Sequence, residues 1–133
     1  MKDKELQNEQ LFIIDGQLIG SILYIVSILI SIIIILDQRK KALGKKEFLT
    51  SQESQILALG NKIFILLLII WFLYLNYKSY ELAKNTNQDT SALQIQIAAS
   101  ILSLIVGLMT LYVVATNFQN TNFQTAEIEN SFI

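Results

Sequence analysis

The chain has 133 residues, of which 53% are hydrophobic and 16% are charged, whereas ordinary soluble domains carry about 25% charged residues. Ten basic and eleven acidic residues nearly cancel, so the charge balance gives no sign of a nucleic-acid-binding surface. The chain contains no Cys and no His, which removes the usual ligands of zinc, haem and iron–sulfur centres and the Cys–His and Ser–His catalytic pairs, and we therefore expect no cofactor and no metal.

The first predicted element is a membrane span over residues 11–36, preceded by a short polar head at residues 1–10. A helix needs about 20 apolar residues to cross a hydrocarbon core about 30 Å thick, and this stretch exceeds that length. It is also longer than the apolar part of a signal peptide, and the sequence Asp37-Gln38-Arg39-Lys40-Lys41 follows it in place of a small-residue cleavage site. We therefore expect a span that is retained.

The connection to the second span is short. The first helix is expected to end at Gly44, because Gly favours the position after a helix C-terminus and cations favour the last turn. Thr50-Ser51-Gln52-Glu53 matches a capping box. It predicts a second helix from Ser51 to near Lys84, with its span at residues 56–77.

A polar turn at residues 85–90 leads to the third span, at residues 94–115. Ser91-Ala92-Leu93-Gln94 is a second capping-box match, which predicts a helix that starts there and fades near Asn117. Residues 117–133 form a polar C-terminal tail that is expected to be either disordered or a docking peptide. The three spans, over residues 11–116, form the single membrane domain.

Short connections make consecutive helices antiparallel neighbours. The predicted fold is therefore an all-α, polytopic membrane protein, a three-helix up-down-up transmembrane bundle. Basic residues concentrate in the first loop, which indicates that this loop is cytoplasmic, with the N-terminus outside and the C-terminus inside. The basic cluster is expected to contact anionic lipid headgroups of the bilayer; it comprises Arg39, Lys40, Lys41, Lys45 and Lys46.

Small residues recur on one face of the first span and on one face of the third. The first set is Gly16, Gly20, Ser27 and Ser31, and the second includes Ala99, Ser103 and Gly107. Small residues let transmembrane helices approach closely. The two faces are expected either to meet within one chain or to pair between chains as a homo-oligomer.

Three ionisable residues lie in or beside the spans. Asp15 is the one acid within an apolar run, and Lys78 is its expected ion-pair partner. Asp15 is interpreted either as a marker of the membrane interface or as a functional group. Lys62 is expected to extend to the headgroups or to pair with Asp37. Near the opposite end of the second helix, Trp71 and three tyrosines indicate an interfacial aromatic belt: Tyr74, Tyr77 and Tyr80.

No catalytic set accompanies these residues, so the sequence favours a protein that is not an enzyme. The leading hypothesis is an accessory or assembly subunit of a membrane complex that acts through helix packing with a membrane-protein partner. One alternative is a self-assembling, holin-like pore former, and a small channel or transporter subunit is a third. The abundance of Ile, Asn and Lys indicates an AT-rich genome and hence a bacterial or viral membrane.

Overall fold

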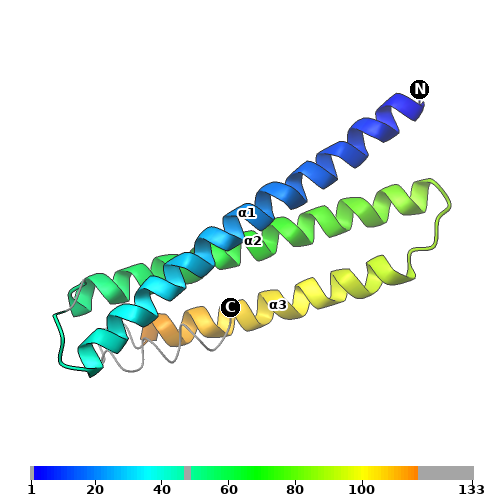
Figure 1. Ribbon diagram of the computed structural model, residues 1–133. Coiled ribbons are helices and arrows are strands. Elements are labelled where there is room, and N and C mark those ends of the chain that lie inside the picture. The colour runs from blue at the N-terminus through cyan, green and yellow to red at the C-terminus, as the bar shows by residue number, and fades with distance from the viewer. Residues whose placement is uncertain (1, 47–48, 117–133) are drawn as a thin grey trace.

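Three long helices make up the computed structural model, which describes residues 2–46 and 49–116 (Figure 1). Helix α1 spans Lys2–Ala42, α2 spans Ser51–Asn85 and α3 spans Ser91–Thr116. All three are long and apolar enough to cross a membrane. The prediction of an all-α, up-down-up arrangement with short loops is confirmed, and the molecule fits a small membrane protein. The predicted C-terminal tail lies outside the described residues.

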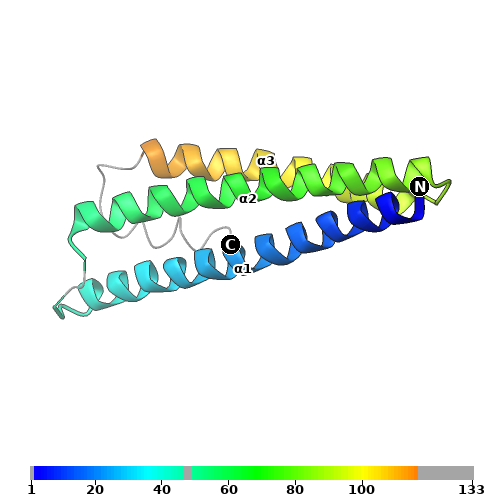
Figure 2. The ribbon, with the colours of Figure 1, turned by 90° about the horizontal axis from the view of Figure 1, so that it is seen from above.

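Helix α2 lies between α1 and α3 (Figure 2). Both outer helices pack on α2, but within the described residues no Cα atom of α1 comes within 8 Å of one in α3. The molecule is therefore a row of helices rather than a closed bundle. Towards the N-terminus of α1, the first two helices diverge (Figure 1).

The helix ends on both sides of the first loop follow the sequence signals. Gly44 has a φ of +73°, and the Lys45 N–H donates to the Lys40 carbonyl at 2.9 Å, which is the Schellman arrangement expected of Gly at this position. At the start of α2, the Thr50 hydroxyl accepts from the Glu53 N–H while the Glu53 carboxylate accepts from the Thr50 N–H. Both predicted end signals are confirmed.

Helix α3 begins at Ser91 as predicted, but the predicted capping box is not formed. Ser91 is the first helical residue, so it does not cap the helix. Instead, the Thr90 carbonyl and hydroxyl accept from the backbone and side chain of Gln94. Asp89 accepts from both the N–H and the hydroxyl of Ser91, at 3.1 and 2.8 Å. The first free N–H of α3 is thus satisfied by the Asp89 carboxylate.

Asp89 should make the N-terminus of α3 sensitive to acid. The backbone and side-chain hydrogen bonds from Ser91 hold the pKa of the Asp89 carboxyl below its ordinary value of 3.8. Since the folded-state pKa is depressed, this stabilisation is present above pH 3.8 and is lost as the pH falls through the lower, folded value. NMR titration should show that the first-turn amides of α3 respond at that lower midpoint. The Asp89→Asn variant should lack the transition, and an unchanged response in that variant would assign it to another group.

The contacts between α1 and α2 fix their depth relative to each other. Asn61 contacts Ser27 and Ser31. These contacts place the middle of the apolar stretch of α1 at the same depth in the membrane as the middle of the apolar stretch of α2. A helix rises 1.5 Å per residue, so a hydrocarbon core of about 30 Å has its limits near Ile13 and Ile33 on α1 and near Tyr77 and Leu57 on α2. Both helices extend well beyond it.

Candidate functional site

The α1–α2 interface has a tightly packed half around the glycines of α1. A Cβ atom added at Gly16 would lie 2.9 Å from Leu75 Cδ2, and one at Gly20 would lie 2.7 Å from Phe72 Cζ. The Trp71 indole N–H donates to the Gly16 carbonyl at 3.0 Å. The two glycines thus form recesses that large side chains of α2 fill.

The other half of the interface, nearer the first loop, is polar. The Ser27 hydroxyl donates to Asn61 Oδ1 at 2.7 Å, and Asn61 Nδ2 donates to the Ser31 hydroxyl at 2.9 Å and to the Ser27 carbonyl at 3.3 Å. Both serines are fully buried and Asn61 is 3% exposed. By the depth given above, Asn61 lies about 6 Å inside the hydrocarbon core. There, an amide must find its partners within the protein.

This polar half continues to the edge of the membrane. Gln38 Nε2 donates to the Ser54 hydroxyl at 3.2 Å. On the preceding residue, the buried Asp37 carboxylate lies 3.0 Å from Lys41 Nζ and accepts from the Leu49 N–H. Asp37 therefore holds the first loop against the end of α1. We call the buried groups from Ser27 to Asp37 the polar seam; its members are Ser27, Ser31, Asp37, Gln38, Ser54, Gln55, Asn61 and Lys62.

The sequence interpretation missed most of the polar seam. The sequence pattern identifies Ser27 and Ser31 only as small packing residues, and it indicates no role for Gln38, Ser54 or Gln55. Lys62 was expected to extend to the headgroups, which is wrong because the side chain is only 2% exposed. Its pairing with Asp37 stays a prediction.

The small faces of the two outer helices do not meet. The α1 face lies towards α2, as does Gly107 of the α3 face, and no Cα atom of α1 lies within 8 Å of one in α3 among the described residues, so the expectation that the two faces pair with each other within one chain is wrong. The physical reason is that the recesses of α1 are complementary to large side chains, and the short first loop brings those of α2 alongside. A pairing between chains stays a prediction.

Helix α3 uses its small face only in part. Gly107 is buried against Leu66 and Ile69, each with a Cδ1 3.2 Å from the position of an added Cβ. Ser103 is half-buried, whereas Ala99 is exposed. A polar link to α2 comes from the neighbouring Ser100, whose hydroxyl accepts from Asn76 Nδ2 at 2.7 Å.

Lys78 contacts aromatic rings instead of an acid. Its Nζ lies 5.0 Å from the centroid of the Phe12 ring and 5.7 Å from that of Tyr74. Asp15 is exposed on α1, and the predicted Asp15–Lys78 ion pair is not formed. An ammonium over an aromatic face is attracted by the ring quadrupole, and more strongly where it is partly removed from water.

The five residues of the basic cluster differ in their exposure to solvent. Arg39, Lys45 and Lys46 are exposed, while Lys40 and Lys41 are half-buried. Lys41 is engaged by Asp37. Three of the five residues are therefore clearly placed for contact with headgroups, and that contact stays a prediction.

A polar pair lies on the outer surface of α1 within the hydrocarbon core. Gln17 and Ser21 are one turn apart and exposed, and among the described residues neither side chain has a hydrogen-bond partner. By the depth given above, Gln17 lies about 6 Å inside the boundary and Ser21 near the middle of the core. Neither residue was singled out from the sequence, although the i, i+4 spacing was visible.

No protein-family model, curated protein or solved structure matches this chain at a significant level. The function is therefore argued from the geometry alone.

Proposed function

We propose that the chain is a non-enzymatic subunit of a membrane complex, and that it binds a membrane-protein partner through the face of α1 that carries Gln17 and Ser21. The observation that supports this proposal is the exposed polar pair at hydrocarbon depth. Lipid tails offer no hydrogen bonds, so a glutamine on that surface favours contact with another helix. Beside this pair, Gly16 and Gly20 pack closely against Leu75 and Phe72, which holds this part of α1 on α2.

The proposal predicts that Gln17 and Ser21 strengthen the partner complex. An interhelical hydrogen bond in a membrane contributes about 1 kcal/mol, or about fivefold in affinity. The Gln17→Leu variant should weaken co-purification of the partner by about that factor while it leaves the α1–α2 pair folded.

A photo-crosslinking residue placed at Ser21 tests the contact in membranes of the native host. A second one at Ile19 is the matched control, because Ile19 has the same depth and is exposed but lies on the opposite side of α1. We expect a protein adduct from position 21 that Gln17→Leu weakens, and lipid adducts alone from position 19. Equal protein adducts from both positions, or from neither, would reject the proposal. An adduct of two copies of the chain would replace it with the pore-forming alternative.

A further inference from the structure

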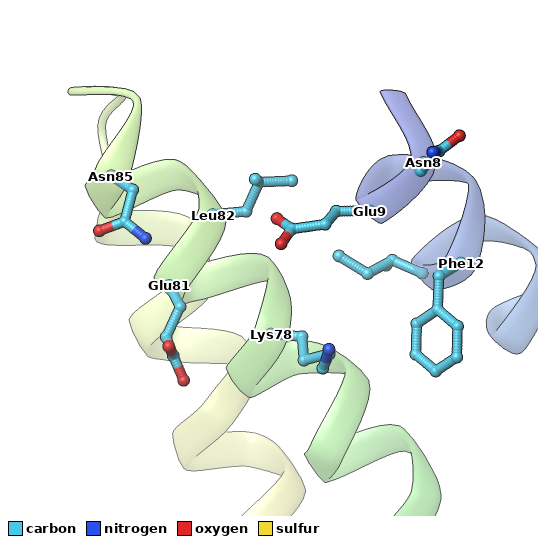
Figure 3. Close-up of a pocket in the computed structure, with 8 residues that line it drawn as sticks. Asn8, Glu9, Phe12, Lys78, Glu81, Leu82 and Asn85 are labelled. Carbon is cyan, nitrogen blue, oxygen red and sulfur yellow. The ribbon is translucent and has the colours of Figure 1, made fainter. Parts of the chain in front are cut away.

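A polar cleft opens where α1 and α2 diverge, at the end of the molecule remote from the first loop (Figure 3). It has a volume of about 300 Å³. Figure 3 shows the Glu9 side chain reaching from α1 into the gap between the helices, with Lys78 turned towards Phe12. The residues that line the cleft are Asn8, Glu9, Phe12, Ile13, Lys78, Glu81, Leu82 and Asn85.

The cleft lies at the depth of the lipid headgroups. The hydrocarbon boundary falls near Ile13 and Tyr77, and the headgroup layer adds about 5–8 Å on each side. Lys78 is thus at the hydrocarbon edge. Glu9 and Glu81 lie three or four residues further out along their helices, which is about 5–6 Å.

The charges are therefore ordered by depth, with an ammonium on the inner side and two carboxylates on the outer side. A zwitterionic phospholipid has the opposite order, since its phosphate lies next to the hydrocarbon and its ammonium lies further out. We propose that this cleft binds the headgroup of a phospholipid with a primary ammonium, that is, a phosphatidylethanolamine. Lys78 would contact the phosphate, and Glu9 with Glu81 would contact the ammonium.

A primary ammonium fits better than a quaternary one. It can donate three hydrogen bonds, and the cleft is lined by the carboxylates of Glu9 and Glu81. A quaternary ammonium cannot donate and is recognised by aromatic faces. Here, the Lys78 ammonium already lies over the faces of Phe12 and Tyr74. Lipids with a net negative headgroup would be repelled by Glu9 and Glu81.

Trp71 allows a direct test, because it is the single tryptophan of the chain and its ring contacts that of Phe12 in the cleft wall. The full chain is reconstituted into phosphatidylcholine vesicles that contain a growing fraction of lipid brominated in the acyl chains. Bromine quenches tryptophan fluorescence only at short range, so the quenching measures the relative association of each lipid. The brominated lipids compared are phosphatidylethanolamine, phosphatidylcholine and phosphatidylglycerol.

We expect phosphatidylethanolamine to associate about fivefold more strongly than phosphatidylcholine, or about 1 kcal/mol. The Glu9→Gln/Glu81→Gln variant should lose that preference, whereas Glu5→Gln, one turn from Glu9 and outside the cleft, should keep it. Equal association of the three lipids, a preference for phosphatidylglycerol, or an unchanged preference in the double variant would overturn the proposal.

A second experiment distinguishes binding of an intact lipid from binding of a soluble molecule that carries the same phosphate and ammonium groups. Phosphoethanolamine is added to the vesicles at millimolar concentration. No effect on quenching, together with the lipid preference, supports an intact lipid. Protection of Trp71 by phosphoethanolamine without any preference among lipids would reject a lipid ligand.

Discussion

The Asn61→Leu variant should lower the free energy of unfolding of the α1–α2 pair by about 2 kcal/mol. Asn61 makes three hydrogen bonds to α1 within the membrane, and Leu can make none. Interhelical hydrogen bonds in membranes contribute about 0.6 kcal/mol each on average and up to about 1.7 kcal/mol. The loss is limited because the Ser27 and Ser31 hydroxyls can turn to carbonyls of their own helix.

Unfolding in mixed micelles of a mild detergent and dodecyl sulfate provides the measurement. Trp71 lies in the same interface, with its N–H on the Gly16 carbonyl, so its fluorescence follows the separation of α1 from α2. Ser21→Ala is the matched control, since that serine is exposed on α1 and should be neutral. A double-mutant cycle between Ser27→Ala and Asn61→Leu should give a coupling energy of about 1 kcal/mol. Additive effects would mean that the two side chains do not interact.

The Gly20→Leu variant should destabilise the same pair by about 2–3 kcal/mol through overpacking. Even a Cβ at this position would lie 2.7 Å from Phe72 Cζ, and the remaining atoms of Leu have no space without separation of the helices. Gly20→Ala should be milder, because the end of the Phe72 ring can shift to admit one methyl group. The emission of Trp71 should move to longer wavelength in the Leu variant as water or detergent enters the interface.

Gly60→Leu provides the control for this steric effect. A Cβ added at Gly60 meets nothing within 4 Å, so the larger side chain should project into lipid without changing the packing. If Gly20→Leu and Gly60→Leu unfold alike, the close approach at Gly20 does not stabilise the protein. Because Gly20 is used within the chain, a loss of function in Gly20→Leu does not by itself indicate a contact between chains.

The helices themselves could be predicted because their signals are local. Each apolar run is long enough to span a membrane, and the ends at Gly44 and Thr50 depend on a few neighbouring residues. The start of α3 at Ser91 was predicted for the same reason, but the capping box there does not form, because Asp89 accepts from both the N–H and the hydroxyl of Ser91.

The interface could not be predicted in the same way. Whether Asn61 lies opposite Ser27 or one turn away depends on the register of two antiparallel helices, which no single segment encodes. A small residue in the sequence also does not indicate which helix will pack against it. The recesses at Gly16 and Gly20 are filled by Leu75 and Phe72 of α2 rather than by the small face of α3. The signal for the seam was present as matching polar positions in reversed order, with Ser27, Ser31 and Gln38 on one helix and Ser54 and Asn61 on the other.

The position of α2 between its two neighbours has a consequence for assembly. No Cα atom of α3 lies within 8 Å of one in α1 among the described residues. The hydrogen bonds of Asn61 with Ser27 and Ser31 join α1 to α2, so they can form before α3 is synthesised. The third helix docks on a finished surface through Gly107 and Ser100. In these terms, a helix from another protein that took the place of α3 on α2 would leave those hydrogen bonds between α1 and α2 in place.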